Sequence, residues 1–257
     1  MRSVEDFALT NALLKQAYAG KVTLNGAGSE HLKDILAENP RLVVAMNHGP
    51  VAGPVAGAIG MLDQYLKNGG EHRKPVIIAW RGFYSIPVIK YGIQYLSQVR
   101  KPLNLNGYVA KLTEQGFTDV FVMPEGENCS FGNGLDIQPF LSPKFIELAL
   151  KADAPILIAV HLGSEQWSSI YPLSKKLDPL FKRLPKKTFE RIAETRQLNL
   201  FPLWLKKIPE LKLSFKLYKP EITLEDLNAE NRYELLQRES DKVRALMQGE
   251  IDELVAG

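Results

Sequence analysis

Cysteine is almost absent from this sequence, and a recognisable export signal is missing. Cys129 is the one cysteine in 257 residues, so an internal disulfide is excluded and a cysteine-based metal site has no ligand set. This composition is typical of a reducing compartment, and we expect a cytoplasmic protein. Glu5 and Asp6 stand near the start of the chain, where a signal peptide would have a basic start followed by an apolar block.

The sequence also lacks an uninterrupted membrane-spanning stretch. The segment from Val43 to Leu62 has His48 as its only titratable group and is about as long as a spanning helix. Gly49-Pro50 and Gly53-Pro54 interrupt it, and proline in a helix interior removes a backbone donor and clashes with the preceding turn. We therefore expect a buried strand, a tight turn and a new helix in this segment.

Several motifs that would define other functions are missing. The sequence has no internal repeat, no Gly-x-Ser-x-Gly nucleophile elbow, no Gly-rich phosphate loop and no zinc-ligand spacing. We expect no metal site, no resident cofactor and no nucleic-acid partner. The length suits one α/β domain that spans residues 1–257.

Positive charge is concentrated in one segment. Lys175 to Lys219 holds 13 Lys and Arg against four acidic residues, a net charge of +9, whereas the rest of the chain carries −6. This mixture of basic and apolar residues predicts reversible binding to an anionic membrane surface, although amphipathic helices with solvated basic faces explain it equally well. The apolar residues are Leu180, Phe181, Leu184, Phe189, Ile192, Leu200, Phe201, Leu203, Trp204 and Leu205.

Short apolar runs alternate with helical patterns over much of the chain. This alternation predicts an α/β fold with a mainly parallel central sheet and helices on both faces. In such folds ligands bind beyond the carboxyl ends of the strands. The predicted strands are Arg41–Asn47, Pro75–Trp80, Asp119–Met123 and Pro155–His161, and the predicted helices are Val55–Leu66, Pro87–Leu96, Val109–Gln115 and Pro143–Ala152.

We expect both ends of the chain to be scaffold. Apolar residues at helical spacing after Ser3 predict an N-terminal amphipathic helix up to Gly20, with Asn11 as the one polar gap in its apolar stripe. Near the other end, Leu213–Tyr218 predicts an edge strand and Thr223 a capped helix start. A long charged C-terminal helix is predicted from Asn231 to Leu254.

Two loops at predicted strand ends carry the candidate site residues. His48 follows a buried strand and precedes small residues that leave room for a ligand, whereas His31, His72 and His161 have no comparable setting. Pro124-Glu125-Gly126-Glu127-Asn128 places two carboxylates directly after an apolar strand. A structural role for Glu125, as a cap on backbone amides in a tight turn, fits the same pattern.

Four blocks in a fixed order carry a resemblance to a known family. They are Asn47-His48, then Arg81-Gly-Phe-Tyr-Ser-Ile-Pro-Val-Ile-Lys-Tyr-Gly92, then Phe121-Val-Met-Pro-Glu-Gly126, and then Ala154-Pro155-Ile-Leu-Ile. The order and spacing resemble the glycerolipid acyltransferase superfamily, of the lysophosphatidic acid acyltransferase type. The resemblance runs from about Leu42 to Val160, and the tail from Lys219 through Thr223-Leu-Glu-Asp to Val243-Arg244 also resembles the family's closing helix.

The resemblance implies acyl transfer with His48 as the base. His48 would take the proton of an acceptor hydroxyl, which attacks a fatty acyl thioester of coenzyme A or acyl carrier protein. The position where the family has aspartate is Gly53, so the usual partner of the imidazole is lost. By analogy with catalytic triads, such a loss costs orders of magnitude in rate. We expect Glu127 or Glu125 to replace it as the carboxylate partner of His48.

The acceptor site departs from the family pattern as well. The family has Glu-Gly-Thr-Arg where this chain has Glu125-Gly126-Glu127-Asn128, so an arginine expected to bind the acceptor's phosphate is missing. Arg100 matches a family arginine and is a candidate anion contact. The resemblance also makes Asn47, Arg81, Gly126 and Asn128 candidate substrate-binding residues.

Three functions therefore remain open. The first is an acyltransferase whose hydroxyl or amine acceptor, a lipid in our interpretation, lacks a phosphate monoester. The second is a family member that binds an acyl chain or thioester without transferring it, as the loss of aspartate at Gly53 suggests. The third is a thioesterase or ester hydrolase in which His48 activates water. For all three we expect a cytoplasmic protein that is peripheral on the inner face of the membrane.

Overall fold

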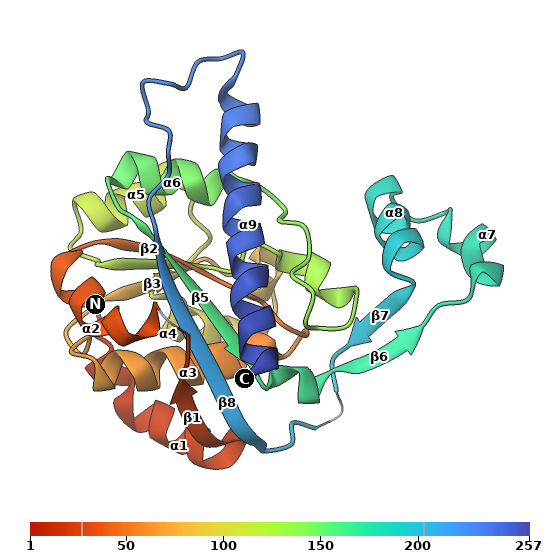
Figure 1. Cartoon of the computed structure of the whole chain (residues 1–257), viewed down its shortest axis with the longest axis horizontal. Coiled ribbons are helices and arrows are strands. Elements are labelled where there is room, and N and C mark those ends of the chain that lie inside the picture. The colour runs from red at the N-terminus through yellow and green to blue at the C-terminus, as the bar shows by residue number, and fades with distance from the viewer. Residues whose placement is uncertain (27, 203) are drawn as a thin grey trace.

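A six-stranded sheet forms the centre of the computed structural model, which describes residues 1–26, 28–202 and 204–257. The strand order is β1-β8-β5-β2-β4-β3, and all neighbouring pairs are parallel except β5 with β8. The mainly parallel sheet is therefore confirmed (Figure 1). The strands are β1 (Ala19–Leu24), β2 (Leu42–Met46), β3 (Pro75–Ile77), β4 (Asp119–Val122), β5 (Ile156–Leu162) and β8 (Ile208–Tyr218).

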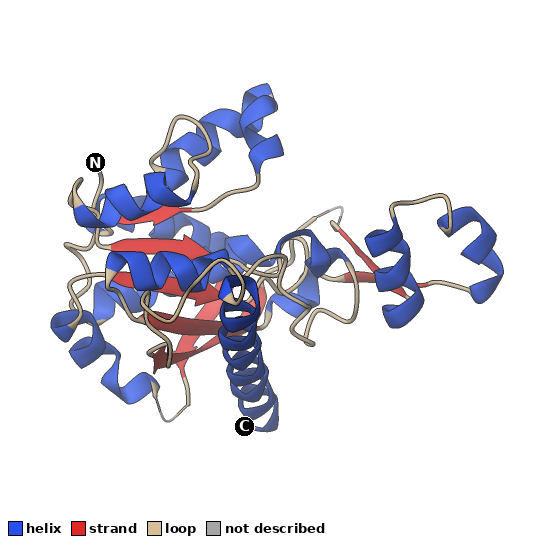
Figure 2. Cartoon of the chain, turned by 90° about the horizontal axis from the view of Figure 1, so that it is seen from above, coloured by secondary structure: helices blue, strands red, loops and turns tan. Residues whose placement is uncertain are grey.

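Helices cover both faces of this sheet, as Figure 2 shows. The alternation of buried side chains along β2 explains why: Val43 and Ala45 point into one hydrophobic cluster, and Val44 and Met46 point into the other. The first cluster is closed by α5, α6 and α9, the second by α1, α2 and α3. The main helices are α1 (Ala8–Tyr18), α2 (Leu32–Glu38), α3 (Gly53–Lys67), α4 (Pro87–Ser97), α5 (Leu105–Thr113), α6 (Lys144–Ala152) and α9 (Arg232–Ala256).

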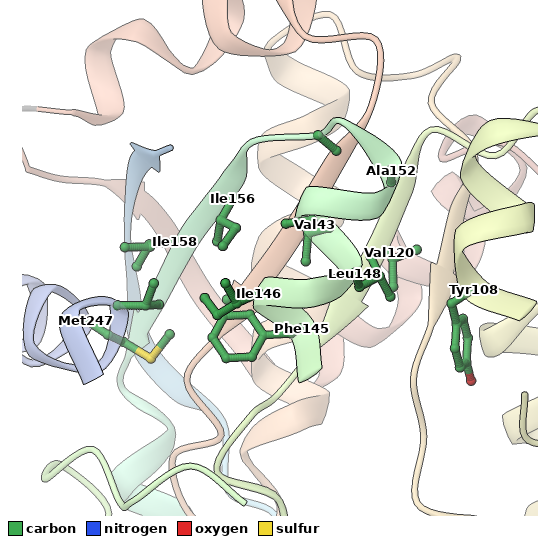
Figure 3. Packing of buried hydrophobic residues seen from close by; sticks show 14 of the residues in the cluster. Val43, Tyr108, Val120, Phe145, Ile146, Leu148, Ala152, Ile156, Ile158 and Met247 are labelled. Atoms are coloured by element: carbon green, nitrogen blue, oxygen red, sulfur yellow. The ribbon is translucent and has the colours of Figure 1, made fainter. Parts of the chain in front are cut away.

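In the first cluster, residues of α6 pack on the sheet (Figure 3). Ile146 and Leu148 of α6 are almost fully buried and lie against the strands β2, β4 and β5. Met247 extends the cluster from α9. Burial of each such side chain contributes about 1.5–3 kcal/mol. This core fixes the strand ends on which the site is built.

The N-terminal and C-terminal helices are both present. Val4 and Phe7 are buried ahead of α1, and Asn11 is buried on its inner face, whereas Leu9 and Leu13 are exposed. The helix α9 begins directly after Asn231, as predicted. No described helix is long and apolar enough to span a membrane.

Two predictions near the C-terminus were wrong. The segment Leu213–Tyr218 belongs to β8, which lies between β1 and β5 and is not an edge strand. Two lysines of β8 contact α9: Lys216 pairs with Glu250 at 3.0 Å, and Lys212 donates to the Leu254 carbonyl at 3.2 Å. Lys216 is therefore charge-paired within the fold, and Lys212 is hydrogen-bonded to the end of α9.

Thr223 does not start a helix. Its backbone N–H and its hydroxyl both donate to Asp226, at 2.7 and 2.9 Å, and the chain forms turns up to the start of α9 at Arg232. The capping pattern thus forms its local hydrogen bonds, but Asn228 and Asn231 form a second such turn directly after it. Side-chain bonds of this kind compete with helix formation.

The first part of the basic segment and the residues just before it form an arm that projects away from the sheet in both views (Figures 1 and 2), whereas Ile208–Tyr218 of the segment is strand β8 of the sheet. The antiparallel strands β6 (Ser169–Pro172) and β7 (Gln197–Leu200) form its base, and the helices α7 (Asp178–Phe181) and α8 (Lys186–Thr195) form its tip. The base is tied to the body by a β-bridge between Leu198 and Phe131. Leu203, one of the apolar residues of this segment, lies outside the described residues.

Candidate active site

His48 and Glu125 meet because they follow neighbouring parallel strands. β2 pairs with β4 in parallel, so the loops after Met46 and Val122 leave the same edge of the sheet. The backbone N–H of His48 donates to Oε2 of Glu125 at 2.6 Å. The other carboxylate oxygen, Oε1, accepts the backbone N–H of Gln138 at 2.8 Å. Glu125 therefore links three segments through backbone amides.

The imidazole of His48 is held by a carbonyl group. Its Nδ1 lies 3.2 Å from the carbonyl oxygen of Pro50. Because a carbonyl oxygen can only accept, Nδ1 carries the hydrogen, and the lone pair of the neutral ring is on Nε2. Burial lowers the pKa of His48, so the ring is neutral at neutral pH. A neutral imidazole with a defined free nitrogen is the form that a general base requires.

No carboxylate binds this imidazole in the described part of the chain. Both oxygens of Glu125 are directed at backbone amides, and Glu127 is exposed, without a described hydrogen bond or ion pair. The expected direct contact of Glu125 or Glu127 with the ring is therefore not formed. The contacts of Glu125 are instead those of the predicted structural role, a cap on backbone amides. Glu125 positions the His48 turn through the backbone.

Gly53 has no room for the aspartate that the family pattern places there. A Cβ atom at Gly53 would lie 1.9 Å from the carbonyl oxygen of His48. The backbone N–H of Gly53 donates to the Pro50 carbonyl at 2.7 Å, which closes the turn tightly. The Pro50 carbonyl thus occupies the role of orienting group, as a dipole without a full charge.

Cys129 faces the free nitrogen of His48. Its Sγ lies 3.7 Å from Nε2, and the side chain is buried in the short helical turn Gly126–Ser130. Burial, and secondly the charge of Glu125, raise the pKa of the thiol to about 12. The group is therefore a protonated thiol, a weak donor to Nε2, and not a thiolate nucleophile.

His161 lies beside the site, contrary to our expectation. It belongs to β5, is buried, and donates from Nε2 to the Gly53 carbonyl at 3.0 Å. A Cβ atom at Gly49 would lie 3.1 Å from its ring, so the turn packs directly on His161. Burial, and secondly the charge of His48, lower its pKa to about 4. The apolar strand around His161 concealed this contact at the sequence level.

Asn47 and Asn128 have structural contacts. The side chain of Asn47 accepts the N–H of His161 at 2.8 Å and donates to its carbonyl at 3.1 Å, which extends the β2–β5 pairing. Asn128 donates to the Pro139 carbonyl at 2.7 Å. Gly126 has a positive φ of 51°, and a Cβ atom there would lie 2.3 Å from Leu141. These three residues shape the loops around His48 and Glu125.

Arg81 and Arg100 are not joined to these loops. Both are exposed, and neither side chain has a hydrogen bond or ion pair within residues 1–26, 28–202 and 204–257. Arg100 follows Gln98, whose side chain donates to the carbonyl of Pro75 at the amino end of β3. Arg100 thus lies toward the amino end of β3, whereas His48 and Glu125 follow the carboxyl ends of β2 and β4, so its assignment as an anion contact is weakened.

The loop 131–143 contributes residues that the sequence did not suggest. Gln138 binds Glu125 through its backbone and accepts from the Arg191 guanidinium of α8 through its side chain. Arg244 of α9 donates to the Ile137 carbonyl at 2.8 and 2.9 Å. Burial raises the pKa of Glu125 to about 7, and the two backbone N–H groups and Arg244 oppose this rise. The arm and α9 therefore both bind the loop 131–143, which in turn binds Glu125.

Comparisons with known proteins add no family assignment. No family model matches the chain, and no curated protein matches it significantly. Among the described residues, no group of three or more His, Cys, Asp and Glu side chains is placed to hold a metal ion. The functional interpretation therefore depends on the geometry of the His48 turn and on the sequence blocks around it.

Proposed function

We propose that this protein transfers an acyl group from a thioester to a hydroxyl or amine acceptor, with His48 as the general base. The observation that carries the proposal is the geometry of His48: Nδ1 is bound to the Pro50 carbonyl, and Nε2, which faces the weakly donating Cys129 thiol, is the basic atom. Its position beyond the carboxyl end of a central parallel strand is where α/β folds bind ligands. The order of the four sequence blocks supports the same chemistry.

The proposed reaction needs one proton carrier. Nε2 of His48 takes the proton of the acceptor hydroxyl while its oxygen attacks the thioester carbonyl carbon. The C–S bond then breaks, and the leaving thiolate takes the proton back from Nε2. The Pro50 carbonyl stabilises the Nδ1–H of the imidazolium that forms between these steps. The acyl donor would be acyl-CoA or an acyl carrier protein.

The membrane is the second proposed partner. Lys182, Arg183 and Lys187 are exposed at the tip of the arm, and so are the apolar side chains of Leu180 and Leu184. None of these three cations has a described acidic partner. Exposed cations beside exposed leucines suit an anionic lipid surface. A cytoplasmic location at the inner face of the membrane stays a prediction.

A second candidate function is thioester binding without transfer. It is favoured by the missing carboxylate partner of His48 and by the thiol that lies against Nε2. The tight contact at Gly53 also excludes a simple return of the aspartate. In this case the site would hold an acyl thioester and release it unchanged.

One assay separates these functions. The protein is incubated with a radiolabelled long-chain acyl-CoA and a panel of lipid acceptors, beside the His48→Gln variant. Formation of acylated acceptor by the wild type, with a loss of at least about a hundredfold in the variant, supports the proposal. Release of free acid indicates a hydrolase. Retention of labelled thioester without either product indicates a binding protein and contradicts the proposed transfer.

A further inference from the structure

Asn199 is a fully buried residue whose side chain has no partner among the described residues. It lies in β7 at the base of the arm, with 0% of its surface exposed. Neither its Oδ1 nor its Nδ2 has a hydrogen bond in the described part of the chain. A buried polar group left unsatisfied costs about 1–3 kcal/mol, so an orphaned carboxamide needs an explanation.

A second orphaned group points to the same place. The hydroxyl of Ser168, just before β6, is also buried without a described partner. A Cβ atom at Gly134 would lie 3.5 Å from Nδ2 of Asn199, 3.7 Å from Oγ of Ser168 and 3.8 Å from Cδ of Pro50. The two orphaned groups therefore converge under a residue without a side chain.

This place adjoins the His48 turn. Pro50 supplies the carbonyl that holds the imidazole, and its ring lies beside the same Cβ position at Gly134. Gly134 is itself half-buried, and a carbon atom in the place of its missing side chain would make only ordinary van der Waals contacts with these groups. The bridge between Leu198 and Phe131 fixes the neighbouring backbone of β7 to the loop that contains Gly134.

The chemistry of the two groups defines what can bind. A carboxamide offers both donors and an acceptor, and a hydroxyl offers either. Both groups are neutral, and Oδ1 would repel an anion. A secondary amide or a hydroxyl group matches this set, because it can donate and accept at the same time.

We propose that Asn199 and Ser168 form a subsite that binds an uncharged amide or hydroxyl group of a substrate held at His48. This inference rests on the proposed function for the identity of the ligands. Two sources have the required chemistry: the amides of the pantetheine arm in the acyl donor, and the head group of a neutral acceptor. The orphaned atoms of the free protein would be satisfied in the complex.

The test compares Asn199→Leu with a matched control, Asn11→Leu. Leucine has nearly the shape of asparagine and removes the polar cost at both positions. Asn11 is also buried, in α1 outside the site, with an Oδ1 that has no described partner. Binding is measured by calorimetry with two probes that cannot react, a long-chain S-alkyl thioether of CoA and a 1-monoalkylglycerol, and Tm is measured in parallel.

The expected result separates binding from stability. Both variants keep or raise Tm. Only Asn199→Leu weakens the binding of one probe, by about tenfold or more, because two hydrogen bonds to it are lost. The probe that binds more weakly identifies the ligand of the subsite as the acyl donor or the acceptor. Ser168→Ala should weaken the binding of the same probe. Unchanged affinity in Asn199→Leu, or no binding of either probe to the wild type, overturns the subsite. Binding without transfer in the wild type would contradict only the proposed reaction.

Discussion

Oε2 of Glu125 lies 2.6 Å from the backbone nitrogen of His48, and this contact joins the two loops that the sequence singled out. The carboxylate acts on the main chain and not on the imidazole. Through Oε1 it also holds Gln138, so one side chain sets the positions of the His48 turn and of the loop 131–143. Glu125 is therefore a positioning residue in the proposed reaction.

The first prediction concerns Glu125→Gln. The pKa of Glu125 is raised to about 7 from an ordinary value of 4.5, so the wild type loses stability as the pH rises from 4.5 through 7. The glutamine does not titrate. The free energy of unfolding of the variant, relative to wild type, should rise by up to about 3 kcal/mol between about pH 4.5 and pH 8. Urea unfolding at several pH values measures this difference, and a constant difference would contradict it.

Glu125→Gln should lower acyl transfer at the same time. A glutamine has one acceptor and one donor group, so it cannot accept both backbone N–H groups in the present geometry, and one of them loses its partner. We expect the His48 turn to loosen and the maximal rate to fall by about tenfold or more. Equal activity of the variant and the wild type at pH 8 would show that Glu125 has no positioning role.

The second prediction concerns His161→Phe. The stability contribution of His161 changes with pH in the opposite direction to that of Glu125. The pKa of His161 is lowered to about 4 from 6.5, so its contribution to stability is present above pH 6.5 and is lost as the pH falls through 4. The contribution reaches about 3 kcal/mol. Phenylalanine leaves the Gly53 carbonyl unpaired at every pH, but it should flatten the loss of stability between pH 6.5 and 4. An unchanged acid slope in urea unfolding would show that His161 does not titrate in this range.

The strands of the sheet were predictable where they are continuous apolar runs. β2 and β5 are buried on both faces, and their sequences contain no Asp, Glu, Lys or Arg. β1 was missed because Gly20, Lys21 and Thr23 give it no such run, and its pairing partner β8 comes almost 190 residues later. Its position depends on long-range pairing that no local pattern records.

The site was predictable only in part. The loops of His48 and Glu125 could be placed together, because the carboxyl ends of parallel strands share an edge. The hydrogen bonds of His48 and Glu125 could not be predicted, because these bonds depend on the tight turn at Gly53 and on the path of the loop 131–143. Sequence patterns report residue types, but the Pro50 carbonyl and the Gln138 amide are backbone groups that almost any residue would supply.

The third prediction uses the contact between Cys129 and His48. The thiol is a weak donor, so an acceptor hydroxyl should displace it from Nε2 easily. Serine would donate a stronger hydrogen bond and compete with the acceptor. We expect Cys129→Ser to lower the rate of transfer and Cys129→Ala to keep or raise it, at a cost of about 1 kcal/mol in stability. Loss of activity in the alanine variant alone would indicate a chemical role for the thiol.

The fourth prediction concerns the arm. A variant with Lys182, Arg183 and Lys187 changed to alanine should bind anionic vesicles at least about tenfold more weakly, because each cation near such a surface contributes about 1 kcal/mol. The control changes Lys33, Lys101 and Lys144, which are exposed outside the arm. Co-sedimentation with anionic and neutral vesicles at two salt concentrations measures the effect. Equal losses in both variants would show that the net charge, and not the arm, governs binding.

The last prediction concerns the acceptor. Glu127 is exposed in the loop beside the site and has no described partner, so its charge is free to act on a ligand. A phosphate monoester placed there meets this carboxylate, and it also lacks the arginine that the family pattern would provide. We therefore expect lysophosphatidic acid to be a poor acceptor beside a neutral lipid alcohol.

Glu127→Gln tests this idea with a change of one charge and little change of shape. It is preferable to Asn128→Arg, because Asn128 holds the loop through Pro139 and its loss would disturb the site. We expect the specificity constant for lysophosphatidic acid to rise by about tenfold, equivalent to about 1.4 kcal/mol, with the value for a neutral acceptor unchanged. Glu114→Gln, an exposed carboxylate after α5, should change neither value. If lysophosphatidic acid is the best acceptor of the wild type, Glu127 does not select against phosphate.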